Sequence, residues 1–163
     1  MKEVITILSM VEKNIAKVFM GLMTALVIFD VISREIFNTG LPWAQKSAVY
    51  LMIWSGFLGA IMISEKAAHL RPEVADKIWG EKGKILFVRI QNLVSILFCS
   101  FFMFASYRYV SQSFEFGDKS VVLDIPLWIL QLIIPYMFFS ILLRHLYFLL
   151  NPNEQLAIKK EIH

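Results

Sequence analysis

The sequence predicts an all-α membrane protein with four transmembrane helices in a tilted bundle. Of its 163 residues, 58% are hydrophobic and 18% are charged, whereas ordinary soluble domains are roughly 45–50% apolar and about 25% charged. The apolar excess lies in four runs, each approaching the roughly 17–25 residues that a helix needs to cross a bilayer. We therefore expect one integral membrane domain over residues 1–163, with spans at about 15–36, 43–64, 86–108 and 124–148.

The first span has the shortest apolar run. Its uninterrupted part covers residues 18–29, and Lys17 at one end and the Asp30–Arg34 pair at the other are able to reach the two interfaces. Before this span, apolar residues recur at helical spacing with polar residues between them, which predicts an amphipathic interfacial helix at the N-terminus. No compact apolar signal-peptide core follows a basic start, so we expect the first span to remain in the mature protein.

The second span carries small residues that favour close helix packing. Turn-forming residues at positions 38–42 precede it, and Trp43 follows where an aromatic anchor would lie at the lipid headgroups. Small residues four positions apart let a neighbouring helix backbone approach closely. The span holds two overlapping pairs of this kind, Ser55 with Gly59 and Gly56 with Ala60.

The remaining spans follow a polar connector. Residues 65–84 are rich in charges, and the pattern after Pro72 predicts a second amphipathic interfacial helix between spans two and three. Gln91 and Asn92, near the entrance of the third span, are candidates for hydrogen bonds between helices. In the fourth span, Pro126 suits the first turn, whereas Pro135 lies mid-span and should kink the helix.

Basic residues are distributed unevenly between the two predicted sides. Twelve of the 16 Lys and Arg residues fall in the N-terminal stretch, the long connector with the entrance of the third span, and the C-terminal side. The positive-inside rule then places both termini and this connector in the cytoplasm of a bacterial inner membrane. Loops at about 38–45 and 111–123 would face the periplasm. The net charge of +3 is too small and too scattered to indicate nucleic acid binding.

No pattern indicates an enzyme, a cofactor or a metal site. No charged residue falls in the middle third of a predicted span, and the single cysteine, Cys99, cannot form an internal disulfide. Asp30, Arg34 and Glu35 could mark an ion or proton site between helices, but a helix-end ion pair is the favoured interpretation. His69 and His145, at the cytoplasmic ends of spans, could ligate haem, although ordinary interfacial residues are favoured.

Several local motifs follow one another along most of the chain. They are Asp30-Val31-Ile32-Ser33-Arg34, Phe37-Asn38, Leu41-Pro42-Trp43, Trp54, Phe57-Leu58-Gly59-Ala60, His69-Leu70-Arg71, Gly117, Ser120, Leu123 and Ile125-Pro126-Leu127-Trp128. Their order resembles the small membrane subunit, or Q subunit, of the tripartite ATP-independent periplasmic (TRAP) transporters. One difference from that family lies near the start of the second helix, where the family usually has one or two acidic residues and this chain has Gln45 and Lys46.

The resemblance implies that this chain is surrounded by membrane lipids and acts as a scaffold for two partner proteins. A large membrane subunit would carry the sodium and substrate sites, and a periplasmic binding protein would deliver an organic acid, such as a C4-dicarboxylate or a sialic acid. Two other functions remain open, a stand-alone homo-oligomeric carrier and a haem-bearing anchor of an oxidoreductase. Candidate contacts with the large subunit are Arg34, Trp43, Ser55, Gly56, Gly59 and Ala60, and candidate contacts with the binding protein are Glu115, Asp118 and Lys119.

Overall fold

The computed structural model describes residues 2–67 and 81–152, and this part of the chain consists of helices joined by loops. Four of its segments are long and apolar enough to cross a membrane, namely Glu3–Phe37, Pro42–Ser64, Ile85–Phe116 and Leu127–Leu150. The predicted all-α fold with four transmembrane helices is therefore confirmed. The helices are α1 (Lys2–Phe37), α2 (Pro42–Ala67), α4 (Glu81–Phe116), α5 (Leu127–Gln131) and α6 (Ile133–Leu150).

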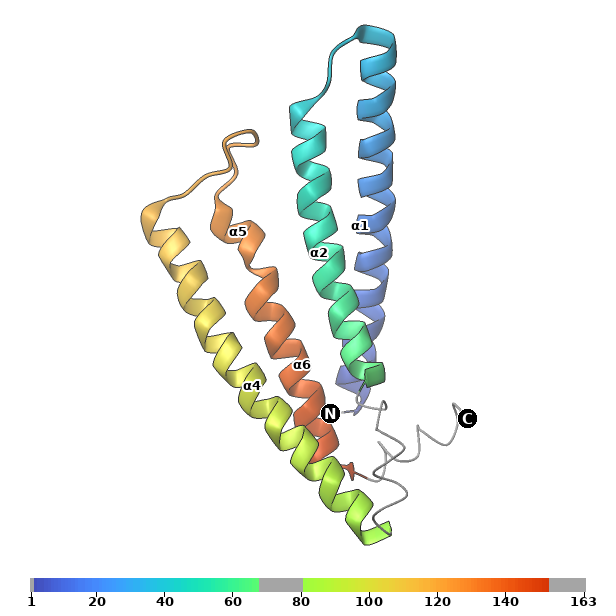
Figure 1. The fold of residues 1–163 in the computed structure, drawn as a ribbon, viewed down its shortest axis with the longest axis vertical. Coiled ribbons are helices and arrows are strands. Elements are labelled where there is room, and N and C mark those ends of the chain that lie inside the picture. The colour runs from blue at the N-terminus through green and yellow to red at the C-terminus, as the bar shows by residue number, and fades with distance from the viewer. Residues whose placement is uncertain (1, 68–80, 153–163) are drawn as a thin grey trace.

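The helices form two antiparallel pairs that lie side by side (Figure 1). One pair is α1 with α2, and the other is α4 with the consecutive helices α5 and α6. Helix α2 packs against α6 and so joins the pairs, which gives the order α4, α6, α2, α1 across the view. Both interhelical loops, residues 38–41 and 117–126, lie at one end of this row. Because the row is flat, much of each helix is left open to lipid or to another chain.

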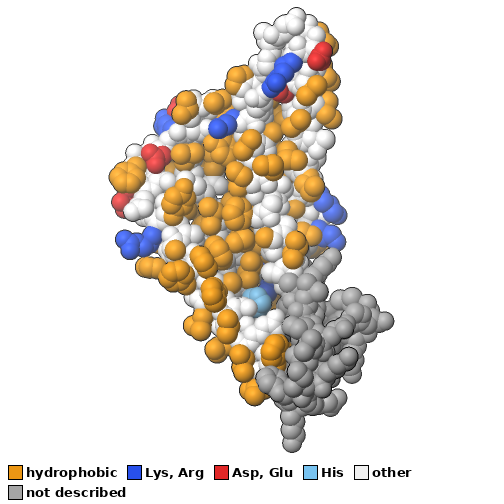
Figure 2. Space-filling model, viewed as in Figure 1, with side chains coloured by type: hydrophobic (Ala, Val, Ile, Leu, Met, Phe, Trp, Pro, Cys, Tyr) orange, Lys and Arg blue, Asp and Glu red, His pale blue; other side chains and the backbone are white. Residues whose placement is uncertain are grey.

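A small buried core lies where the two pairs meet. It contains Leu58 and Ile61 of α2 together with Ile133 and Met137 of α6, and Ala16 of α1 completes it. The remaining apolar surface faces outward, as a hydrocarbon solvent permits. Figure 2 shows hydrophobic side chains over the middle of one face, with charged side chains mainly along its margins.

Helix α1 includes the predicted N-terminal amphipathic segment without a break. At 36 residues it is about 54 Å long, against a hydrocarbon thickness of about 30 Å. The helix must therefore tilt strongly or extend beyond the hydrocarbon. The amphipathic helix expected after Pro72 and the residue His69 lie outside the described residues.

The fourth span is interrupted one turn before its central proline. Helix α5 ends at Gln131 and α6 begins at Ile133. Pro135 has no N–H to offer to the carbonyl of Gln131, four residues earlier, so the regular hydrogen-bond ladder fails there. The predicted kink is confirmed. Pro126 lies just before α5, at its N-cap position.

Both loops are shorter than the sequence suggested. Helix α2 begins at Pro42, close to the expected start of the second span at about 43, whereas α4 continues to Phe116, so the expected loop boundary at 111 was wrong. Proline is favoured in a first helical turn, and residues 111–116 contain no helix breaker. Gly117 follows with φ of +65°, a left-handed conformation that glycine adopts without strain and that ends many helices.

Candidate functional site

The small-residue face of α2 is open in the described chain. Gly56 and Ala60 are exposed, and Ser55 and Gly59 are half-buried. A Cβ added to Gly56 or Gly59 would meet no described atom within 4 Å. The Ser55 hydroxyl donates to the carbonyl of Met52 at 2.9 Å, within its own helix. No described helix of this chain therefore makes the close approach that these small residues would allow.

Asp30 ties the end of α1 to the start of α2. Its buried carboxylate accepts hydrogen bonds from Arg34 Nη2 at 2.8 Å and from the backbone N–H of Leu41 at 2.7 Å. Leu41 directly precedes α2, where N–H groups have no partner within the helix. The ion pair with Arg34 is thus present as favoured from the sequence, and the carboxylate also caps the next helix. Both Arg34 and Trp43 leave part of their surface exposed beside this junction.

Gln45 has a defined role in the same junction. Its side-chain Nε2 donates to Asp30 Oδ2 at 2.9 Å. A carboxylate at position 45 would offer no donor and would bring a second negative charge to Asp30. The amide at position 45 is therefore suited to donate to the buried Asp30 carboxylate, which lies on the other helix of the α1–α2 pair.

The loop between α4 and α5 is held by main-chain hydrogen bonds. Ser120 N–H donates to Ile125 O, Leu127 N–H donates to Asp118 O, and an antiparallel bridge pairs Lys119 with Pro126. The Tyr50 hydroxyl of α2 donates to Ser120 Oγ at 3.1 Å, which connects the loop to the other helical pair. The motif residues between Gly117 and Pro126 thus build an ordered turn.

The end of α4 and this loop present the three candidate docking residues, Glu115 on α4 and Asp118 and Lys119 in the loop. Glu115, Asp118 and Lys119 are all exposed. Lys119 Nζ lies 3.2 Å from Asp124 Oδ1, but both side chains are largely open to solvent, so this ion pair contributes little to stability. The charges therefore remain accessible to another protein.

A buried ion pair between α1 and α6 was not found from the sequence. Glu12 Oε2 accepts a hydrogen bond of 2.5 Å from Arg144 Nη2, and the two side chains are only 1% and 2% exposed. Tyr136 and Ser140 donate to Glu12 Oε1 at 2.8 and 2.6 Å. Arg144 also donates to Ser9 Oγ at 2.9 Å and to both oxygens of Ser140.

The sequence did contain one signal for this network. Tyr136, Ser140 and Arg144 are spaced four residues apart and so lie on one side of α6, a helix that is otherwise largely apolar. Glu12 lies in the N-terminal segment predicted to be an interfacial helix, and Arg144 follows the uncharged part of the fourth span. Pairing them requires knowing that α1 and α6 lie together.

His145 and Cys99 are the histidine and the cysteine in the described part of the chain, and both are buried. His145 is buried, and its Nδ1 lies 2.8 Å from Asn92 Oδ1 of α4. Asn92 therefore bonds between helices as expected. Cys99 is a buried free thiol. Among residues 2–67 and 81–152, no three His, Cys, Asp or Glu side chains gather as a metal site would require.

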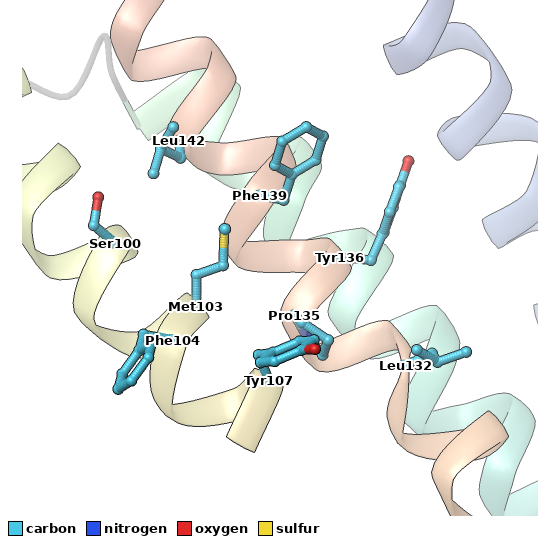
Figure 3. Close-up of a pocket in the computed structure, with 9 residues that line it drawn as sticks. All are labelled: Ser100, Met103, Phe104, Tyr107, Leu132, Pro135, Tyr136, Phe139 and Leu142. Carbon is cyan, nitrogen blue, oxygen red and sulfur yellow. The ribbon is translucent and has the colours of Figure 1, made fainter. Parts of the chain in front are cut away.

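Three pockets formed by described residues have no basic side chain in their lining. An open groove of about 530 Å³ lies between α4 and α6 beside Pro135, where Ser100 and Tyr107 contribute hydroxyls. Tyr136 also lines it, but its hydroxyl points away from α4 and donates to Glu12 of α1 (Figure 3). Two smaller pockets, of about 450 and 220 Å³, contain Glu12 and Asp30 as their charged members. Neutral or acidic linings are poorly suited to bind a carboxylate.

Comparison with known proteins gives consistent matches. Residues 23–153 match the family described as tripartite ATP-independent periplasmic transporters, DctQ component. The chain is 25% identical over 99 residues to the C4-dicarboxylate TRAP transporter small permease protein DctQ of Vibrio cholerae, covering 61% of this chain and 43% of that protein. It is 28% identical over 80 residues to a putative TRAP transporter small permease protein of Haemophilus influenzae, covering 49% and 50%. The matches thus span half or less of each relative's length.

Proposed function

Because the chain belongs to the DctQ family of TRAP transporter components, we propose that it scaffolds a sodium-coupled complex that imports an organic acid. It is a small permease subunit with several spans in the inner membrane. A separate large membrane subunit carries the sodium and substrate sites, and a periplasmic protein delivers a C4-dicarboxylate, a sialic acid or a related carboxylate. The present chain holds the large subunit in place.

The open small-residue face of α2 carries this proposal. Small residues let helices pack closely in lipid, where no hydrophobic driving force brings them together. Gly56 and Ala60 are exposed four residues apart, so a partner helix can approach the α2 backbone there. The exposed face of α4 is different, because it presents the bulky rings of Phe98, Phe101 and Phe104. This contrast favours α2 as the docking side and α4 as a lipid-facing side.

The cavity chemistry supports a scaffold over a carrier. An organic acid pathway needs a cationic or strongly donating lining, whereas the three described cavities contain only neutral groups, Glu12 and Asp30. The ordered loop at residues 117–126 supports a second contact. Its exposed charges, together with Glu115, give the periplasmic protein a surface on which to dock.

Replacing Gly56 with Leu tests the docking face. The added side chain should prevent close packing and reduce co-purification of the large subunit by about tenfold or more, which corresponds to roughly 1.4 kcal/mol or more. Gly21→Leu is a matched control, because Gly21 is also exposed on a helix and a Cβ there meets nothing within 4 Å. Native mass spectrometry of the co-expressed subunits measures the complex, and an undiminished complex with Gly56→Leu would contradict the proposed face.

A further inference from the structure

Four residues of α1 form a seam that faces α6. Ile5, Ser9, Glu12 and Ala16 are spaced four, three and four residues apart, which is the heptad-like spacing of helices that pack along each other. Ile5 packs against Tyr147 and Phe148 of α6. At the other end of the seam, Ala16 belongs to the buried core described above.

The middle of this seam is polar and the two ends are apolar. Ser9 and Glu12 face Arg144 and Ser140, with Tyr136 joining from the same side of α6. Glu12 receives donors on both carboxylate oxygens, and both charged side chains are almost fully buried. The layer therefore pairs its two charges within the chain.

A buried polar layer between apolar layers discriminates strongly between registers. If α1 slid along α6 by one helical turn, about 5.4 Å, apolar contacts would still form but Glu12 and Arg144 would lose each other. An unpaired buried charge is far more costly than the loss of one apolar contact. A single polar layer fixes register in coiled coils by the same physics.

We infer that the Glu12–Arg144 pair pins the register of α1 against α6 and so sets the position of one helical pair relative to the other. Glu12 and Arg144 are then positioning residues for the docking face, since α2 is packed on α1. The role of this ion pair in positioning the docking face rests on the proposed scaffold function. The fixed register itself does not depend on that function, because it is a property of the isolated chain.

Distances between spin labels in the full-length protein test the pin. With Cys99 replaced by Ala, Ile7→Cys and Leu150→Cys place labels at exposed positions on α1 and α6. Double electron–electron resonance should give one narrow distance in the otherwise unchanged chain. Glu12→Gln or Arg144→Gln should broaden this distribution or shift it by about 5 Å, one helical turn. The exchanged pair Glu12→Arg with Arg144→Glu should restore a narrow distribution.

Controls separate register from folding. Glu3→Gln and Arg89→Gln make the same chemical changes at exposed positions and should leave the distance unchanged. If a single variant does not fold, the double variant Glu12→Gln with Arg144→Gln removes both charges and should still broaden the distribution. A narrow, unshifted distance in Glu12→Gln or in the neutral double variant overturns the inference, as does an exchanged pair no narrower than the single variants.

The two proposals fail independently. Gly56→Leu with an undiminished complex would refute the docking face and leave the label distances unaffected. Unchanged distances in Glu12→Gln would refute the pin, whatever happens to binding of the large subunit.

Discussion

Single polar side chains hold the ends of these helices together. The Asp30 carboxylate of α1 accepts a hydrogen bond from the N–H of Leu41, just before α2. It accepts another from the side-chain amide of Gln45, one turn further along. The Arg34 guanidinium is about half exposed, so water screens much of its attraction to Asp30. The N–H of the half-buried Leu41 and the side-chain amide of the exposed Gln45 donate two further hydrogen bonds to the carboxylate, and hydrogen bonds to a charged group contribute roughly 1.5–3 kcal/mol each.

Changing Gln45 to Glu should destabilise this junction. The change removes a donor to Asp30 and places a second negative charge beside it, so we expect a loss of about 1–3 kcal/mol in unfolding free energy. Thermal unfolding in detergent measures the loss. Adding Asp30→Asn to the same chain should recover part of it, since one carboxylate then remains.

Gln112→Glu provides the control for this prediction, because Gln112 is exposed on α4 and should tolerate the same change. A stability for Gln45→Glu equal to that of Gln112→Glu would contradict the role assigned to Gln45.

At the scale of elements, the fourth span is a broken helix, and another helix donates a hydrogen bond to one of its backbone carbonyls. The α5 helix has only five residues, so its last carbonyls lack regular partners. The Trp54 indole of α2 donates to one of them, Leu130 O, at 3.0 Å. The break also shapes the groove beside Pro135, where side chains of α4 and α6 face each other (Figure 3). A neighbouring helix thus supplies a hydrogen-bond donor that the irregular backbone lacks and that hydrocarbon cannot provide.

Trp54→Phe should therefore cost about 1–3 kcal/mol of stability, since it leaves the Leu130 carbonyl without this donor. Phenylalanine keeps an aromatic ring against Phe19, whose centroid lies 5.9 Å from that of Trp54. Trp43→Phe, at a residue that is 46% exposed, is the matched control. Equal unfolding temperatures for the two variants would show that the indole hydrogen bond contributes nothing.

At the scale of the whole molecule, the flat arrangement gives two helical pairs with one polar layer and one small core between them. The N-terminus of α1, the C-terminus of α6 and the polar layer lie toward the end opposite the two loops. We propose that this end faces the cytoplasm, on the basis of the Lys and Arg distribution.

Single-cysteine labelling tests this orientation. In a chain with Cys99→Ala, Val121→Cys should react in intact cells with a maleimide that does not cross the inner membrane, because Val121 is fully exposed in the outer loop. Glu3→Cys, which is also exposed, should react only after the inner membrane is opened. The opposite pattern would invert the topology.

Sequence patterns predicted the elements well where local physics decides them. The apolar runs predicted the four helices, and Pro135 predicted the interruption of the fourth span. The four-residue spacing of Asp30 and Arg34 predicted their ion pair. The loop boundaries were less accurate, because residues 111–116 have no strong preference that marks a helix end. The site residues stay predictions: the glycines of α2 have open space beside them in the described chain, and the partner that would fill it is a proposal.

The sequence alone determined that this chain crosses the membrane with four helices and resembles a transporter's small subunit, since hydropathy and motif order are properties of the linear chain. The tertiary structure decided which polar residues are paired. Glu12 and Arg144 are separated by 131 intervening positions, and Trp54 meets Leu130 across two helical pairs. Buried charges and freed carbonyls need partners, and the packing of helices determines which side chains come within reach.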